Sequence, residues 1–101
     1  MDSFSALCAD TLFECPCEPI HYGLVVHRTI TLGGFHDTSW SVSDPVCGCK
    51  VCEGEGREGA LLALERIRQD FGSAAAFLAE LYRQRDRIQR GLPPTDRSRP
   101  H

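Results

Sequence analysis

Two clusters of cysteines are the strongest constraint on how this chain can fold. The sequence CPC occupies residues 15–17, and the sequence CGCKVC occupies residues 47–52. If the stretch between them, residues 18–46, forms one β-hairpin, the two clusters meet at its open end. Five converging thiols are more typical of a closed metal site than of a catalytic device. A chain of 101 residues also needs such a cross-link, because a domain of this size buries only a modest core.

The stretch between the clusters carries the pattern of two strands. Over residues 22–32 the even-numbered positions are mostly apolar, with Arg28 as the exception. The glycine pair at 33–34 supplies the permissive backbone of a tight reversal. Trp40 and Val42 then lie on one side of a second strand. We therefore expect an antiparallel hairpin with one apolar face.

The register of this hairpin follows from side-chain parity, because directly opposed residues of an antiparallel pair point to the same face. Two registers keep the apolar residues together: one pairs Val26 with Trp40, and the other pairs Leu24 with Trp40. Both place residues 15–17 opposite residues 47–49. We expect the thiols of the two clusters to face each other.

The C-terminal half carries two helical stripes. Apolar residues recur at helical spacing over 60–71 and again over 74–88. Gly72-Ser73 between them is either a C-cap followed by an N-cap or a weak point in one long helix. Residues 53–59 have the composition of a flexible polar link. We expect a helical segment over residues 58–90.

The expected fold class is α+β: a metal-closed antiparallel β-hairpin, followed by a C-terminal helical hairpin or one long kinked helix. Residues 1–90 are expected to form a single small domain, with the hairpin at 13–54 and the helical segment at 58–90. Residues 91–101 are expected to be a disordered tail. The segment before the hairpin is expected to be a short helix or an irregular lead-in, in which Cys8 is a buried small hydrophobe rather than a ligand.

Charge is distributed unevenly along the chain. Residues 1–56 hold two basic and eight acidic side chains, whereas arginines concentrate from residue 83 onward. An acidic body is a poor footprint for nucleic acid, so the Arg-rich segment is expected to be a solvated helix end. The sequence shows neither a signal peptide nor a spanning segment, which predicts a cytoplasmic protein with no membrane partner. In the cytoplasm, clustered cysteines bind metal more often than they form disulfides.

The cysteine spacing favours zinc. Four thiolates complete a closed tetrahedral zinc site, and the C-x2-C spacing of Cys49 and Cys52 lets both sulfurs reach one ion. Cys15 and Cys17 form a tighter pair, whose Cα atoms would lie about 6.6 Å apart on one side of an extended strand. We expect a structural Zn2+ held by these four cysteines, with Cys47 replacing one of the second pair as the main alternative.

Other ligands and metals fit these residues less well. The spacings match neither ferredoxin pattern of an iron–sulfur cluster. His21, His27 and His36 are expected to lie on the hairpin surface, because enough thiolates are already present. Cys47, as the fifth thiol, allows a redox interpretation in which it forms a disulfide on oxidation and the ion is released. The alternative is a buried or spare thiol.

On these residues, the segment 13–54 resembles a zinc ribbon, a β-hairpin with metal-binding turns at its base. Zinc ribbons are common in the transcription and translation machinery as contact modules for nucleic acid or protein, and they usually carry the metal as structure. The chain departs from that family in its first knuckle, which is C-x-C, and in the extra Cys47 of its second.

We therefore expect a non-enzymatic, small zinc-binding protein that acts as a protein-interaction or regulatory module, of a transcription-linked or phage accessory kind. A closed cysteine site leaves no open metal position for catalysis. Two alternatives stay open: a thiol-based redox or metal sensor, and a nucleic-acid-binding zinc ribbon that uses the Arg-rich C-terminal segment. The expected partner is another protein, and the second helical stripe also allows self-association.

Overall fold

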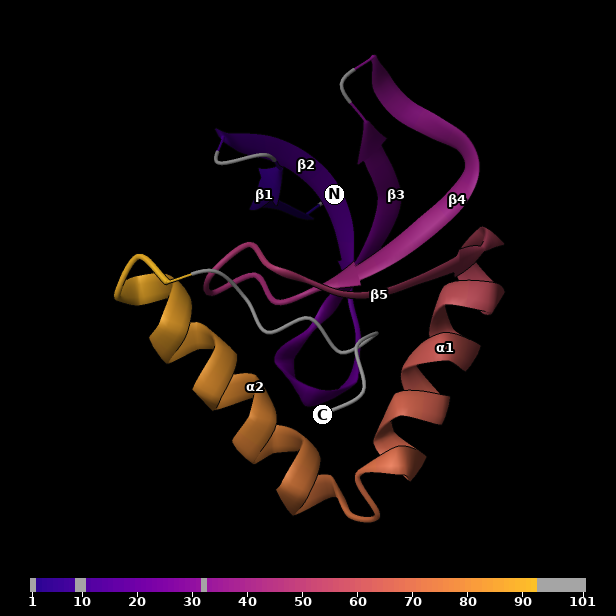
Figure 1. Cartoon of the computed structure of the whole chain (residues 1–101). Coiled ribbons are helices and arrows are strands. Elements are labelled where there is room, and N and C mark those ends of the chain that lie inside the picture. Colours follow the sequence, from indigo (N-terminus) through magenta and orange to yellow (C-terminus); the bar gives the residue numbers. More distant parts are fainter. Residues whose placement is uncertain (1, 9–10, 32, 93–101) are drawn as a thin grey trace.

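The computed structural model describes residues 2–8, 11–31 and 33–92. It shows a five-stranded antiparallel sheet in the order β1-β2-β3-β4-β5, with two helices (Figure 1). The elements are β1 (Asp2–Cys8), β2 (Thr11–Pro19), the 3-10 turn η1 (His21–Gly23), β3 (Val25–Thr31), β4 (Gly34–Ser43), β5 (Lys50–Glu55), α1 (Gly56–Asp70) and α2 (Ala74–Gln89). The α+β class expected from the sequence is confirmed. Residues 93–101, which make up most of the expected tail, lie outside the described residues.

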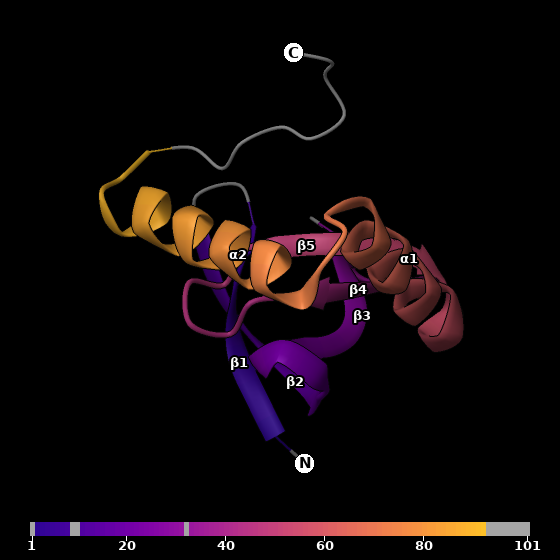
Figure 2. The same ribbon diagram turned by 90° about the horizontal axis from the view of Figure 1, so that it is seen from below.

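Two apolar cores lie on the two faces of β3, because neighbouring side chains of a strand point to opposite faces. Val26 points to the face that the helices cover, and Val25 points to the face that the β1–β2 hairpin covers. Figure 2 shows the helices on one side of the central strands and the β1–β2 hairpin on the other. The buried residues of the helix-side core are Leu24, Val26, Val42, Ala60, Leu64, Phe77 and Leu81. Those of the second core are Phe4, Ala6, Cys15, Cys17 and Val25.

The hairpin expected around the glycine pair is confirmed, since β3 and β4 are antiparallel neighbours. The expected parity is also confirmed, because Val26 lies opposite Val42 and both belong to the helix-side core. Both expected registers are wrong, however. The residue opposite Trp40 is Arg28, neither Val26 nor Leu24.

A bulge inside the hairpin explains the different register. The pair Arg28–Trp40 is followed by the pair Ile30–Phe35. Between these pairs β3 has one residue, Thr29, whereas β4 has four, residues 36–39. Beyond the bulge the faces are exchanged, and Ile30 packs against the second core. A strict period of two in the sequence cannot show such an insertion.

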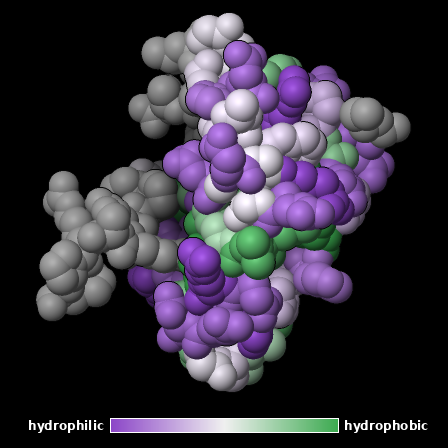
Figure 3. Space-filling view, turned by 90° about the vertical axis from the view of Figure 1, so that its right-hand side faces the viewer, coloured by the Kyte–Doolittle hydropathy of each residue, from purple (hydrophilic) through white to green (hydrophobic). Residues whose placement is uncertain are grey.

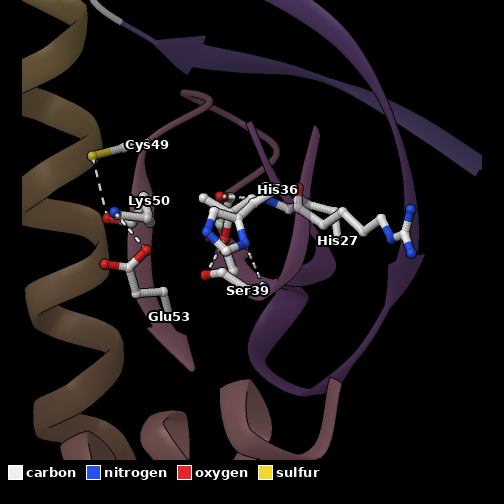
Figure 4. Close-up of polar contacts among 10 residues, drawn as sticks. His27, His36, Ser39, Cys49, Lys50 and Glu53 are labelled. Atoms are coloured by element: carbon white, nitrogen blue, oxygen red, sulfur yellow. Dashed lines mark hydrogen bonds and ion pairs between the residues drawn. The ribbon is translucent and has the colours of Figure 1, made fainter. Parts of the chain in front are cut away.

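Polar side chains hold this bulge together. The hydroxyl of Thr29 lies 2.8 Å from that of Ser39 and 2.6 Å from that of Ser41. The Nδ1 atom of His36 accepts hydrogen bonds from the backbone N–H groups of Thr38 at 3.2 Å and Ser39 at 3.0 Å (Figure 4). His36 is exposed, as expected, and its ring nitrogen closes the bulge.

The expectation of one continuous hairpin over residues 18–46 is wrong. The chain reverses at η1, where Tyr22 has a φ of 64° and the N–H of Ile20 donates to the carbonyl oxygen of Leu24 at 2.9 Å. Residues before this turn therefore belong to β2, which pairs with β3 on the edge away from β4.

The lead-in expected at the N-terminus is also wrong, because residues 2–8 form a strand. β1 pairs with β2 along its whole length, from Asp2 opposite Cys17 to Cys8 opposite Thr11. The alternation of serine with Phe4 and Ala6 is the sequence signal of this strand. Cys8 ends β1, and its side chain lies outside the described residues.

The flexible link expected at residues 53–59 is replaced by a tight strand-to-helix junction, in which β5 ends at Glu55 and α1 begins at Gly56. Gly54 lies directly against the first turn of the helix. A Cβ atom placed on Gly54 would stand 2.4 Å from the carbonyl carbon of Gly59. The composition of this segment suggested flexibility. In the structure, its glycines instead allow the strand and the helix to come into close contact.

The helical segment consists of two separate helices that form a V (Figure 1), so the expected alternative of one long helix is wrong. Gly72 has a φ of +80° between them. Ser73 is the N-cap of α2, and its hydroxyl accepts a hydrogen bond from the N–H of Ala76 at 3.1 Å.

The outer surface beside α1 is mostly polar, with apolar residues gathered in a band across the middle (Figure 3). In the described part of the chain, neither helix has the length and apolar character that crossing a bilayer requires. Leu62 of α1 is 61 % exposed.

Candidate functional site

The first cysteine pair is buried in the second core. Cys15 is fully buried and Cys17 is nearly so, beside Phe4, Ala6 and Val25. Burial raises the pKa of Cys15 to about 11, with the neighbouring Cys17 adding to the effect. Burial also raises the pKa of Cys17, with a further contribution from the charge of Asp2. In this environment both side chains are neutral thiols at pH 7.

The second pair lies in the loop between β4 and β5. Cys47 and Cys49 are both partly exposed. A hydrogen bond from Cys49 lowers the pKa of Cys47 to about 7, and the positive charge of Arg85 acts in the same direction. Burial and the nearby carboxylate of Asp44 oppose this shift. The Sγ atom of Cys49 also lies 3.8 Å from the carbonyl oxygen of Lys50 (Figure 4). The ammonium group of Lys50 forms an ion pair with Glu53 at 3.3 Å.

The fifth clustered cysteine is Cys52. It is on β5 opposite Val42, and its sulfur lies 3.6 Å from the carbonyl oxygen of Ala60 in α1. It packs against the helix-side core. Its environment is that of a small hydrophobic residue with a weak donor.

Among the described residues, the structure therefore does not gather three or more of the predicted zinc ligands into one site. It groups Cys15 with Cys17 and Cys47 with Cys49. Within residues 2–8, 11–31 and 33–92, no three Cys, His, Asp or Glu side chains are arranged as metal ligands. The expectation that residues 15–17 lie opposite residues 47–49 is wrong, because the turn at η1 places β2 and β4 on opposite edges of β3. Zinc binding by these cysteines stays a prediction.

The loop that holds Cys47 and Cys49 is fixed to α2 by an ion pair. The Nε atom of Arg85 donates to the Oδ2 atom of Asp44 at 2.5 Å, and the Asp44 side chain is only 3 % exposed. The same carboxyl group accepts the N–H of Val46 through Oδ1 at 3.0 Å. One buried aspartate thus connects the loop to the second helix.

Three arginines of α2 and its C-cap pair with carboxylates of the chain itself. Arg83 pairs with Glu80 at 2.6 Å, and Arg90 pairs with Asp86 at 3.1 Å. Together with the Arg85–Asp44 pair, these contacts neutralise much of the positive charge that the sequence concentrates here. Arg97 and Arg99 lie outside the described residues. Nucleic-acid binding by the Arg-rich segment stays a prediction.

His27 is buried, which corrects the expectation that it lies on the hairpin surface, whereas His21 and His36 are exposed as expected. A carbonyl oxygen can only accept, so the Nδ1–H of His27 donates to the Arg28 oxygen at 2.6 Å. The Nε2 atom then accepts from the hydroxyl of Ser43 at 2.8 Å. Burial lowers the pKa of His27 below 6.5, against the opposing effect of the Arg28 hydrogen bond. The ring is held neutral.

We expect acid to destabilise the fold through His27. The unfolded chain binds the proton at the ordinary pKa of 6.5, and the folded protein binds it only at lower pH. The contribution of neutral His27 to the free energy of unfolding is therefore complete above pH 6.5. It is lost as the pH falls below 6.5, by at most about 1.4 kcal/mol per pH unit. Urea unfolding across this range measures the slope. His27→Gln should flatten it, and the surface variant Leu62→Ala should leave it unchanged. An identical slope in His27→Gln would show that another group titrates.

A groove of about 420 Å³ opens between β2 and β3. Within the described residues these strands pair at Glu18–Val26 and Pro19–Val25 and then separate, β2 following β1 and β3 following β4. Figure 1 shows the two hairpins diverging from this point. The strand edges that face the groove beyond these pairs have no strand partner among the described residues.

The lining of the groove combines apolar side chains with one unpaired cation. Phe35, half exposed, and Trp40 come from β4, and Val26 comes from β3. Glu18, at the rim, is engaged by the guanidinium of Arg57 at 2.7 and 2.5 Å. The exposed Arg28 forms no ion pair with any described residue. The groove therefore offers an apolar surface with a positive charge beside it.

Sequence reasoning missed this groove. One local signal is Arg28, the single charged residue in the apolar alternation of β3. A second signal is Phe35, a large aromatic residue directly after the glycine pair. Neither signal shows that β2 and β3 separate.

Comparisons of the chain with protein-family models, with curated proteins and with solved structures found no match. The function is therefore inferred from the residues and their geometry.

Proposed function

We propose that this chain is a non-enzymatic protein-interaction module that binds an extended segment of a partner protein in the groove between β2 and β3. The observation that supports this most directly is the combination, in one groove, of unpartnered strand edges with a half-exposed aromatic side chain. Both the main chain, through the strand edges, and the side chains of the groove can therefore contact a partner.

The main chain favours an extended partner. Where β2 and β3 diverge beyond Glu18–Val26, the edge of either strand can pair with an added strand. Peptides that add a strand to a sheet gain affinity from main-chain hydrogen bonds and specificity from pockets for alternate side chains. An extended peptide satisfies both features of this groove.

The side chains favour a peptide that carries an apolar anchor and a carboxylate. Aromatic residues and arginine are the side chains that most often dominate binding energy at interfaces. Here Phe35 and Trp40 supply the apolar contact, and Arg28 supplies the charge. Because Glu18 is already paired with Arg57, the charge left to a ligand in the groove is positive.

The test is selection of peptides from a random display library on the full-length protein. We expect enrichment of sequences with an aromatic or large aliphatic residue near an aspartate or glutamate. Trp40 is the single tryptophan of the chain, so binding should change its fluorescence. Phe35→Ala and Arg28→Ala should each weaken binding by about tenfold or more, and the surface variant Leu62→Ala should bind normally. Failure of enrichment, or binding indifferent to Phe35 and Arg28, would overturn the proposal.

Structural zinc remains part of the proposal as predicted from the sequence, with Cys15, Cys17, Cys49 and Cys52 as ligands and Cys47 as the alternate. Elemental analysis of the purified protein and of Cys15→Ser and Cys49→Ser tests it directly. One zinc per chain that is lost in both variants would support a four-thiolate site. Absence of zinc from the purified wild-type protein would reject it.

A further inference from the structure

The loop between β4 and β5 folds so that its two cysteines lie close together. The N–H of Gly48 donates to the carbonyl oxygen of Asp44 at 2.7 Å, and the N–H of Asp44 donates to the carbonyl oxygen of Cys49 at 2.9 Å. Gly48 has a φ of +77°, a conformation that glycine adopts without strain. The turn therefore places Cys47 and Cys49 on either side of a glycine that allows the chain to bend sharply.

The two thiols interact directly. Cys47 and Cys49 share a side-chain hydrogen bond and a backbone hydrogen bond. Two residues separated by one in a turn have Cα atoms closer than the about 6.6 Å of an extended strand. That separation falls within the range of about 4.4–6.8 Å that disulfides span.

The other C-x-C pair of the chain provides an internal contrast. Cys15 and Cys17 have the same spacing, but they lie on an extended strand and are buried in the second core. Cys47 and Cys49 are partly exposed, so that a small oxidant can reach them. The same sequence spacing thus occurs in one accessible and one inaccessible setting.

We propose that Cys47 and Cys49 form a reversible dithiol–disulfide site that reacts with low-molecular-weight disulfides of the glutathione class. One thiolate of the pair attacks a sulfur of the small disulfide, whose S–S bond breaks and releases one small thiol. The second thiolate then attacks the mixed disulfide, the intrachain S–S bond forms, and the second small thiol leaves. Two electrons and two protons pass from the protein to the small disulfide, which balances the exchange.

The position of this site gives oxidation a structural consequence. The turn that would be closed by the disulfide begins at Asp44, the residue that holds Arg85 of α2. The disulfide would restrict the loop at its contact with the second helix. This site is separate from the groove between β2 and β3, so the disulfide proposal and the peptide-binding proposal can fail independently. A disulfide between Cys47 and Cys49 excludes zinc binding by these two residues, and elemental analysis of the same sample distinguishes the two outcomes.

The experiment equilibrates the full-length protein with oxidised glutathione, alkylates the remaining thiols after denaturation, and maps them by mass spectrometry. We expect Cys47 and Cys49 to be protected in more than about nine molecules out of ten and Cys15 and Cys17 in fewer than about one in ten. Reduction by dithiothreitol should return both thiols of the loop.

Variants separate this pair from its neighbours. Cys47→Ser should stop at a mixed disulfide of Cys49 with one glutathione, because the second thiol is missing. Cys52→Ser is the matched control, since it removes a thiol close in sequence, and it should leave the loop disulfide unchanged. A disulfide between Cys49 and Cys52, preferential oxidation of Cys15 and Cys17, or no protection of Cys47 would each overturn the proposal.

Discussion

Replacing Gly54 with alanine is expected to destabilise the protein by about 3 kcal/mol, because the added methyl group has no space. Its Cβ atom would lie 2.4 Å from both the carbonyl carbon and the carbonyl oxygen of Gly59, and 2.7 Å from the backbone nitrogen of Ala60. These neighbours are backbone atoms, which cannot rotate away as a side chain can. Relief requires α1 to move off β5, and that movement opens the helix-side core. The free energy of urea unfolding measures the loss.

Gly59→Ala is the matched control for this prediction, since it adds the same methyl group to the other side of the contact. A Cβ atom there would meet its nearest neighbour at 3.4 Å, an ordinary van der Waals distance. Because Gly59 lies in α1, alanine should be neutral or should stabilise the helix by up to about 1 kcal/mol. Equal effects of the two substitutions would contradict the close junction described for β5 and α1.

Phe77→Ala is expected to cost about 3–5 kcal/mol, the usual range for removing a buried aromatic side chain. Phe77 is fully buried, and its ring centroid lies 5.2 Å from that of Tyr22 and 5.8 Å from that of Phe71. It joins α2 to the η1 turn and to the end of α1. Thermal and urea unfolding should both show the loss.

Leu62→Ala provides the comparison for Phe77→Ala, because it truncates a large apolar residue that is 61 % exposed. A surface change of this kind should stay within about 0.5 kcal/mol of the wild type. A small effect at Phe77, close to that at Leu62, would mean that α2 does not pack on the sheet as described.

Four of the regular elements, β3, β4, α1 and α2, were accessible from the sequence, because periodicity is a local property, whereas β1, β2 and β5 were not predicted as strands. The alternation that predicts β3 and β4 and the two stripes that predict α1 and α2 correspond to elements of the structure. Ser73 was correctly allowed as an N-cap. The exact pairing was not accessible, since the bulge at Thr29 changes the register without leaving a gap in the alternation.

The arrangement of the cysteines could not be predicted for a different reason. The parity argument assumed that the strand of β3 continues back through residues 15–17, and a single reversal at η1 removes that condition. Tyr22 adopts a left-handed backbone conformation there, which non-glycine residues rarely do. A tyrosine at this position therefore does not predict a turn. Only Gly23 hints at the turn. The spacing of the cysteines was visible in the sequence, whereas their separation is a property of the three-dimensional path.

The groove is likewise a property of how the strands are arranged. It exists because β2 leaves β3 after the pair Glu18–Val26. Its lining draws on residues from 16 to 40, which no local pattern connects. Arg28 interrupts the apolar alternation of β3 in the sequence, and in the structure it lines the groove.

The order of the strands also affects how the chain reaches this fold. Each strand pairs with its neighbour in the sequence, from β1 to β5. Forming each pair therefore closes only a short loop, and the entropy lost at each step is small. The sheet can grow one hairpin at a time, as a rapid succession of local steps, and α1 follows directly on its last strand. Such a topology lets most of the sheet assemble while the C-terminal helix is still being synthesised.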